Sequence, residues 1–352
     1  MMPKSYLTAS GRNQDVKPGA ERQRSATIKD IARRLGLSYA TVSRALNNKY
    51  GVKPDTREKV VAVARELNYR PNAIARGLIT RRTQTIGLVI PDLRNPFFPE
   101  VAAGIETAAE EMGYSVLLGS SDWSEQREDR YMNLLVERRV DGIILAPVHR
   151  ISDRFAMPLP PDVPLVYVTS APAGTDAGYV VIDNKRGGYI VTEHLLSRGY
   201  APVAFLGAEN GSDTGEARRE GYRAALEAFG QPYDAGNVML GPFTRAGAAE
   251  LIHKVAAMQR LPRAVFCEND DLALSVIETV LSLGLRVPED VAVAGFDDIP
   301  WAGMHTVELT TVAQPIHEMG RRALRMLIDC IESDCNPSAD VLEPRLVVRR
   351  TT

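Results

Sequence analysis

Hydrophobic positions near the N-terminus recur with the period of two short amphipathic helices joined by a tight turn. The first helix has apolar residues at i, i+3, i+4 and i+7, namely Ile28, Ile31, Ala32 and Leu35. Thr27 can cap this helix, with Asp30 as its capping-box partner. Gly36 stands where the chain must turn sharply, and Ser38 can cap the next helix. This order predicts a helix-turn-helix.

The second helix has two faces of different character. Its apolar back consists of Val42, Ala45 and Leu46, and its polar front consists of Tyr39, Ala40, Ser43 and Arg44. A polar front that carries an arginine is suited to docking in the major groove of DNA. The alternative is an ordinary helical hairpin on a globular surface.

A third helix is predicted after the polar loop 47–55, because Val60, Val63, Ala64 and Leu67 again follow helical spacing. Together the three helices predict an all-α headpiece over 27–71. The dipeptide Arg70-Pro71 interrupts it, since proline disfavours helix in the preceding residue. The segment 72–83 is compatible with a helix but too short to be stable alone in water, which predicts a hinge helix and linker.

From Thr85 onwards, short β-rich runs alternate with helical segments. The runs are TIGLVI, YSVLLG, GIILAP and PLVYVT, then VAFLG, AVFC and VAVAGF, with helices expected near 185–198, 214–229, 244–258, 269–283 and 316–333. This alternation predicts parallel sheets flanked by helices, in a two-lobed α/β core over 84–352. The expected lobes are about 84–183 plus 314–340, and 184–313 plus 341–352. A single terminal strand is expected in LEPRLVVRR, and pockets should lie at the carboxyl ends of strands.

Charge is divided unevenly along the 352 residues. Residues 1–82 contain 18 Lys or Arg and 6 Asp or Glu, a balance of +12, whereas the remainder has 24 and 38, a balance of −14. A basic head on an acidic body is expected when only the head meets a polyanion. The sequence contains no run of about 18 apolar residues, so no membrane span is predicted. The N-terminus lacks the apolar core of a signal peptide, so residues 1–26 are expected to form a disordered arm.

The candidate chemistry argues against an enzyme. The five histidines show no His-Glu-x-x-His spacing, and neither a Gly-x-Ser-x-Gly elbow nor a Walker-type lysine loop is present. Cys267, Cys330 and Cys335 are odd in number and lack zinc-type pairing with histidine. We therefore expect no metal, no cofactor, and reduced cysteines in a cytoplasmic protein. A sugar-binding enzyme, a transport receptor and an architectural DNA protein remain competing classes.

The ordered motifs resemble the LacI/GalR family of bacterial transcription regulators. They are TIKDIARRLGLSYATVSRALN, VKPDTREKV, LNYRPNAIARGL, IPDLRNPFF, VDGIILAP, RREGYRAAL, ENDDLALSV, VPEDVAVAGFDD and LTTVAQP, and they cover residues 27–350. The resemblance implies a repressor that binds a palindromic operator as a homodimer, or as a tetramer. It also implies a core like that of periplasmic sugar-binding proteins, in which an effector changes operator affinity.

Carried over residue by residue, the resemblance implies two sets of contacts. Those with double-stranded DNA fall on Thr27, Ser38, Tyr39, Ala40, Thr41, Ser43, Arg44, Asn47, Asn72, Ala75 and Leu78. Within this set, Tyr39 and Ala40 match operator-discriminating positions, and Leu78 matches a minor-groove wedge. Those with the effector fall on Asn95, Phe97, Phe98, Asp183, Arg218, Phe243, Asn269 and Asp297.

Each effector residue also has a plain structural alternative. The phenylalanines can pack in the core, Arg218 can form a surface ion pair, and Asp183 or Asn269 can cap a helix. An arginine, a carboxylate, an amide and aromatic faces together suit a polyhydroxylated ring, which favours a saccharide as the small-molecule effector. A purine corepressor and a phosphorylated protein corepressor remain open, because RPNAIARGL also looks like the carbon-catabolite regulators of this family.

Overall fold

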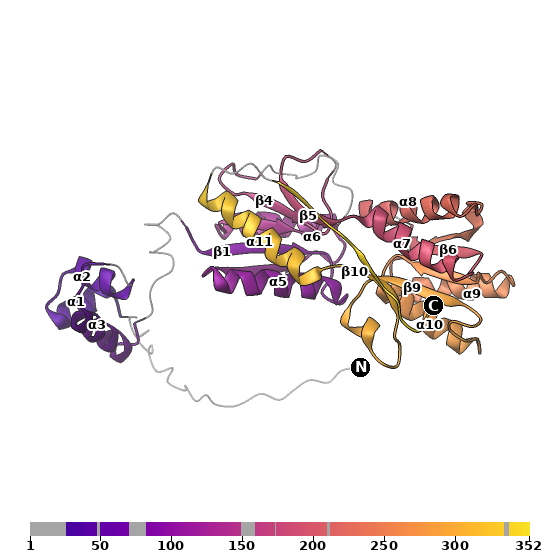
Figure 1. Cartoon of the computed structure of the whole chain (residues 1–352). Helices are drawn as coiled ribbons and strands as arrows, with labels where there is room; N and C mark the ends of the chain where they lie inside the picture. Colours follow the sequence, from indigo (N-terminus) through magenta and orange to yellow (C-terminus); the bar gives the residue numbers. More distant parts are fainter. Residues whose placement is uncertain are drawn as a thin grey trace, which may run out of the picture. The chain divides into compact units, whose positions relative to one another are not determined.

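The computed structural model describes residues 26–47, 50–69, 82–148, 159–172, 174–209, 212–333 and 338–352. The chain divides into two compact units, with the boundary between Arg76 and Gly77 (Figure 1). The predicted arm 1–26, apart from Ala26, and most of the predicted hinge lie outside the described residues. In the described segments, no helix combines the length and the apolar character needed to cross a membrane.

The first unit is the headpiece, which consists of α1 (Ile28–Leu35), α2 (Tyr39–Leu46) and α3 (Pro54–Glu66). Its local signals act as the sequence predicts. The Asp30 carboxylate accepts hydrogen bonds from the Thr27 backbone N–H at 2.9 Å and from its hydroxyl at 2.7 Å. Gly36 ends α1 with a φ of 63°, and the Ser38 hydroxyl oxygen accepts from the Thr41 backbone N–H at 3.1 Å. Ile31, Val42 and Val60 are fully buried and join the three helices.

The first lobe of the core is built on a six-stranded parallel sheet. Its strands are β1 (Thr85–Ile90), β2 (Ser115–Ser120), β3 (Gly142–Leu145), β4 (Leu165–Val168), β5 (Gly178–Ile182) and β11 (Ala339–Leu342), in the order β11-β5-β4-β3-β1-β2. Its helices are α5 (Phe97–Glu111), α6 (Glu125–Glu137) and α11 (Ile316–Glu332). Because the chain reverses its direction along the sheet after β2, right-handed crossovers put α6 on the face opposite α5 and α11.

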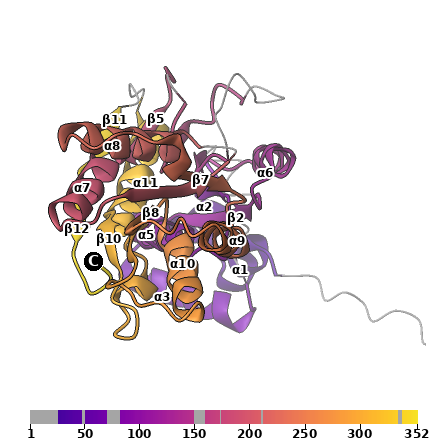
Figure 2. The same cartoon turned by 90° about the vertical axis from the view of Figure 1, so that its right-hand side faces the viewer.

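The second lobe repeats this plan. Its strands are β6 (Val203–Ala208), β7 (Val238–Gly241), β8 (Ala264–Cys267), β9 (Ala292–Asp297), β10 (Thr310–Ala313) and β12 (Arg345–Val347), in the order β12-β10-β9-β8-β6-β7. Its helices are α7 (Asn184–Ser197), α8 (Asp213–Ala228), α9 (Arg245–Ala257) and α10 (Asp270–Ser282), with short 3-10 turns at Ala235–Asn237 and Pro300–Gly303. Helices α7 and α8 cover one face of the sheet, and α9 and α10 cover the other (Figure 2). The predicted α/β fold class is confirmed.

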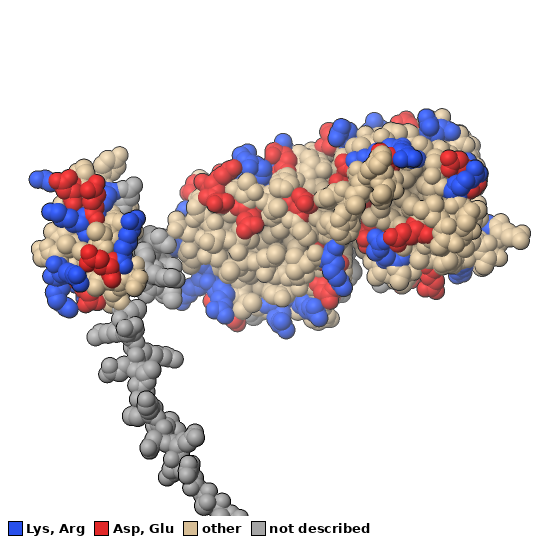
Figure 3. Space-filling model, turned by 90° about the horizontal axis from the view of Figure 1, so that it is seen from below, with Lys and Arg blue, Asp and Glu red and all other residues tan. Residues whose placement is uncertain are grey.

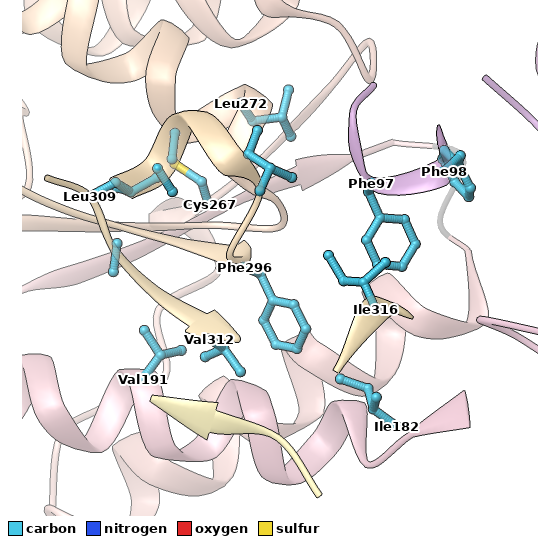
Figure 4. Packing of buried hydrophobic residues seen from close by; sticks show 14 of the residues in the cluster. Phe97, Phe98, Ile182, Val191, Cys267, Leu272, Phe296, Leu309, Val312 and Ile316 are labelled. Atoms are coloured by element: carbon cyan, nitrogen blue, oxygen red, sulfur yellow. The ribbon is translucent and has the colours of Figure 1, made fainter. Parts of the chain in front are cut away.

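The chain crosses between the two sheets three times: after β5, after β10, and between β11 and β12. The terminal strand expected in LEPRLVVRR is present as β12, and a further strand, β11, precedes it and was not predicted. Pro344 separates β11, which pairs in parallel with β5, from β12, which pairs antiparallel with β10. Proline offers no backbone N–H to a sheet, so it suits the point at which the chain leaves one sheet for the other. Figure 4 shows packing near these crossings, with Phe97 beside Ile316.

Glycines let paired helices in each lobe approach to backbone contact. Figure 1 shows α5 beside α11 and α7 beside α8. A Cβ at Gly221 would meet the Lys185 carbonyl oxygen, and one at Gly188 would meet the Arg218 carbonyl oxygen, in both cases inside the 3.0 Å that Cβ atoms essentially never cross. A Cβ at Gly104 on α5 would likewise collide with a backbone carbonyl oxygen of α11. Both lobes therefore depend on a close helix crossing.

The cysteines differ from expectation. Cys267 is free and fully buried, and burial raises the pKa of its thiol. Cys330 is disulfide-bonded, so the prediction that the cysteines are reduced is wrong for it. An odd total leaves room for one pair and one free thiol. Cys335 lies outside the described residues.

Candidate functional site

The first candidate site is the outer face of α2 in the headpiece. Tyr39 is 51% exposed, and Ala40 and Arg44 are also exposed, whereas Val42 and Ala45 are buried beneath them. The helix therefore presents one large aromatic side chain and one arginine to solvent from a rigid base. A short helix held in this way can place side chains against base edges in a major groove.

The remaining headpiece residues predicted to touch DNA surround this face. Thr27, Ser38 and Asn47 are exposed, and Thr41 and Ser43 are half-buried. The Ser38 and Thr41 hydroxyls lie 2.9 Å apart, and the Asn47 amide donates to the Ser43 carbonyl oxygen at 2.9 Å. Asn72, Ala75 and Leu78 lie outside the described residues.

The basic character of the headpiece comes largely from its flanking segments. Residues 26–47 and 50–69 contain eight Lys or Arg and four Asp or Glu, against 18 and 6 for residues 1–82. On α1, Arg33 pairs with Asp30 at 3.2 Å and Arg34 pairs with Glu66 at 3.0 Å. Figure 3 accordingly shows basic and acidic side chains mixed on the visible face of the headpiece.

The second candidate site is a cavity of about 290 Å³ between the two lobes of the core. It is lined by Pro91, Asn95, Phe97, Phe98, Trp123, Pro147, Val148, Thr169, Ser170, Ala208, Glu209, Ser212, Asp213, Thr214, Arg218, Gly241, Pro242, Phe243, Glu268, Asn269, Asp297 and Gln314. Seven of the eight residues proposed from the sequence are among them. The exception is Asp183, whose carboxylate accepts from the Arg186 backbone N–H at 2.7 Å and caps α7 instead.

Arg218 on α8 lines the cavity and is 7% exposed. Its Nε donates to the Asn184 side-chain oxygen at 2.9 Å, and its Nη1 donates to the Glu268 carbonyl oxygen at 2.6 Å. Nη1 also lies 3.6 Å from an Asp297 carboxylate oxygen, and the guanidinium stacks 3.6 Å from the centroid of the Phe296 ring. The alternative interpretation of Arg218 as part of a surface ion pair is therefore wrong, because the guanidinium is buried and held by several partners.

Asp297 ends β9 with an unusual backbone conformation. Its φ is 114°, and that of Asp298 is 58°, in the region that side chains with a Cβ rarely adopt. The Gln314 amide donates to its carboxylate at 2.6 Å. Burial raises the pKa of Asp297 to about 7, although Arg218 and Gln314 act in the opposite direction. Strain and a shifted pKa at one cavity residue are typical of a functional site.

Aromatic rings also line the cavity. Phe98 packs edge-on against Trp123 at 5.8 Å between ring centroids, and Trp123 packs in the same way against Phe243 at 5.6 Å. Trp123 belongs to the first lobe and Phe243 to the second, so this contact spans the cavity from lobe to lobe. Such ring faces can pack against the C–H face of a ligand.

Several lining residues were not predicted from the sequence. Pro147 and Val148 follow β3, Thr169 and Ser170 follow β4, and Glu268 follows β8. All of them come just after the carboxyl end of a strand, where pockets of parallel sheets lie. That rule could have located them, because each of these three strands was predicted. Trp123 lies in the loop between β2 and α6, and its φ is 56°. Hydrophobic periodicity does not predict a residue in such a loop conformation.

The buried carboxylate of Glu128 accepts a hydrogen bond from the backbone of Val148, which lines the cavity. The Val148 backbone N–H donates to the Glu128 carboxylate at 2.9 Å, and Glu128 is 9% exposed. Burial raises its pKa from an ordinary 4.5 to about 7, with smaller contributions in the same direction from Asp129 and Glu125. Ionisation of Glu128 therefore lowers the free energy of unfolding. This loss of stability grows as the pH rises from 4.5 to 7 and is complete above pH 7.

We expect Glu128→Gln to stabilise the protein at pH 8 by about 2–3 kcal/mol and to leave stability nearly unchanged at pH 4.5, since each pH unit between the two pKa values corresponds to about 1.4 kcal/mol. Glutamine retains an oxygen for the Val148 N–H. Urea unfolding at both pH values measures the difference. Glu137→Gln, on an exposed position of the same helix, is the control. An equal effect of Glu128→Gln at both pH values would contradict this prediction.

A helix-turn-helix unit together with a two-lobed core that encloses a polar cavity defines a class, the ligand-responsive DNA-binding transcription regulators. Residues 27–72 match the model for bacterial regulatory proteins of the lacI family, and residues 192–352 match the periplasmic binding protein-like domain. The chain belongs to the LacI family of DNA-binding transcriptional regulators. Its relatives are regulators rather than enzymes.

Three similar proteins define the relationship. The chain is 37% identical to HTH-type transcriptional regulator DegA of Bacillus subtilis (strain 168) over 331 residues, which are 93% of this chain and 98% of DegA. It is 36% identical to the ribose operon repressor of Escherichia coli (strain K12) over 309 residues, which are 86% of this chain and 92% of that repressor. Among solved structures, the complex of the transcriptional regulator CelR with cellobiose has a TM-score of 0.69 at 32% identity, over 93% of this chain and all of CelR.

Proposed function

We propose that this protein is a repressor that binds a specific operator under the control of a sugar or sugar derivative held in the cavity of the core. The observation that carries the proposal is the mixed lining of the cavity. Phe98, Trp123 and Phe243 supply aromatic rings, and Arg218, Asn269 and Asp297 supply polar groups, a combination that suits a polyhydroxylated ring with apolar C–H faces. The ribose operon repressor and the CelR–cellobiose complex support a saccharide by similarity.

The repressor acts as a homodimer on a palindromic operator, in which each headpiece reads one half-site. Exposed apolar side chains support this assembly. Leu117 and Leu118 are 41% and 47% exposed on the edge strand β2, and Leu281 and Leu283 are 55% and 39% exposed around the end of α10. Unpaired edges and apolar side chains of this kind favour association with another copy.

The segment 72–83 acts as the connection between headpiece and core in this proposal. Residues 27–71 read the operator, and residues 84–352 bind the effector and the second copy. The lobes comprise about 84–183 plus 314–340, and 184–313 plus 341–352. A ligand that binds one arrangement of the lobes more tightly than another shifts operator affinity by the same free energy.

Tyr39→Ala tests the operator-reading face. We expect it to change the preferred bases at a few symmetric positions and to weaken binding of the favoured site by about 1–3 kcal/mol, because Tyr39 is the large exposed side chain on the front of α2. Selection from a randomised palindromic library measures the preference. Tyr50→Ala, which removes a fully exposed tyrosine outside α2, is the matched control. An unchanged base preference in Tyr39→Ala would remove Tyr39 from the reading face.

A further inference from the structure

Charge is distributed unevenly around the cavity. Among its lining residues in the described part of the chain, the charged ones all come from the second lobe and are Glu209, Asp213, Arg218, Glu268 and Asp297. Four of the five are carboxylates. The guanidinium of Arg218 is already engaged by Asp297, by the Glu268 carbonyl and by Asn184. The cavity therefore offers a ligand many acceptors and one cation that is neutralised within the protein.

Glu268 is the most deeply placed of the carboxylates that were not proposed from the sequence. It is 4% exposed, and its Oε2 accepts from the Ala208 backbone N–H at 2.8 Å. Its Oε1 receives a long hydrogen bond of 3.5 Å from the Ser212 hydroxyl. Burial raises its pKa, against the influence of Ala208 and Arg218.

The chain makes room for this carboxylate with two glycines. A Cβ at Gly207 would collide with Oε2 of Glu268, and a Cβ at Gly215 would collide with Oε1. Glu268 also lines a neighbouring cavity of about 250 Å³, together with Glu209, Glu216 and Arg219 among others. Glu268 thus lines both cavities, and its two carboxylate oxygens accept hydrogen bonds of unequal length, 2.8 Å at Oε2 and 3.5 Å at Oε1.

We infer that the effector is a neutral or cationic polyol, and that Glu268 selects it by accepting a hydrogen bond from a ligand hydroxyl or ammonium group and by repelling phosphate and carboxylate groups. This inference rests on the proposed function and gives its effector a charge class. A carboxylate acceptor binds a donor more strongly than a neutral acceptor does. An anion placed beside the same carboxylate is repelled by its negative charge. The aromatic wall of Phe98, Trp123 and Phe243 packs against the apolar face of the ring.

The test uses the full-length protein at pH 8, where Asp297 is largely ionised. Calorimetry and operator-binding assays are carried out with ribose, cellobiose, glucose and glucosamine, and with glucose 6-phosphate and gluconate as anionic counterparts. We expect at least one neutral or amino sugar to bind, and its anionic counterpart to bind about 100-fold more weakly. Preferential binding of the phosphate or the acid, or binding by none of these compounds, overturns the inference.

Glu268→Gln isolates the carboxylate, because glutamine keeps the size and an oxygen for the Ala208 N–H. We expect it to weaken the neutral or amino sugar about 10-fold and to reduce the discrimination against the anionic counterpart. Glu227→Gln, on an exposed position of α8 that does not line the cavity, should leave both nearly unchanged. Unchanged discrimination in Glu268→Gln overturns its role as the selecting residue. A sugar that binds as expected without altering operator affinity would instead refute the proposed effector control.

Discussion

Arg218→Ala is expected to lower the free energy of unfolding of the core by about 3–5 kcal/mol and to abolish the effector response, because it removes one partner of a buried ion pair. The substitution leaves the Asn184 side-chain oxygen and the Glu268 carbonyl without the hydrogen bonds that Arg218 donates, and it leaves the Asp297 carboxylate without its cationic partner. It also removes the guanidinium from the lining of the cavity. Operator affinity in the absence of ligand should be retained if the effector acts as an inducer, and should be weak under all conditions if it acts as a corepressor.

Two further variants keep this prediction decisive. Arg218→Lys keeps the charge but loses the planar fork, so we expect a folded protein that still lacks the effector response. Arg219→Ala removes the neighbouring arginine, which is partly exposed and paired with Glu216, and should cost less than about 1 kcal/mol. Urea unfolding and operator titration with and without sugar measure both quantities. A full wild-type response in Arg218→Lys would show that the fork does not hold the effector.

The second large effect is expected for Gly221→Ala, which should destabilise the core by about 3 kcal/mol or more, although alanine is favoured over glycine in a helix by about 1 kcal/mol. The new Cβ would meet the Lys185 carbonyl oxygen and the Tyr189 backbone nitrogen of α7. Backbone atoms cannot turn aside as a side chain can, so α7 and α8 must separate.

Gly303→Ala is the matched control, because the nearest neighbour of the new Cβ would be the Arg349 side chain at 3.7 Å, an ordinary contact. We expect a change below about 0.5 kcal/mol for this surface position. Thermal and urea unfolding of both variants measure the difference. A Gly221→Ala protein as stable as the parent would mean that the two helices are not held at backbone contact.

Local chemistry made much of the fold predictable. Gly36 and Ser38 act within a few residues of the turn that they shape, and the apolar runs TIGLVI and AVFC are strands β1 and β8 within the predicted limits. The strands β5, β7 and β10 were not predicted. Each is four or five residues long, and its place in the sheet depends on partners far away in the chain. Propensity alone does not identify such strands.

The residues of the cavity could also be predicted only in part. Arg218 and Asp297 were proposed only because the motifs around them resemble a family, since nothing in their spacing reveals that they meet 3.6 Å apart. Glu268 was overlooked beside Asn269, whose side chain accepts from the Leu272 backbone N–H and caps α10 as its alternative interpretation allowed. Asp183 was placed in the cavity although it also fitted the cap of α7, and the cap is the role the geometry supports. A capping carboxylate and a ligand-binding one are indistinguishable in sequence.

The three crossings between the sheets restrict how the core can move. Three separate connections near one another leave the second lobe little freedom to slide or twist, so the remaining degree of freedom is rotation about an axis through the crossings. The headpiece is covalently continuous with β1, and therefore with the first lobe alone. Rotation of the second lobe in a solitary chain would move nothing at the headpiece. A partner that contacts both lobes at once, such as another copy of the chain, is needed to convert this rotation into a movement of the headpiece. We therefore expect the effect of the ligand on operator affinity to disappear on dilution to single chains, even while the ligand stays bound.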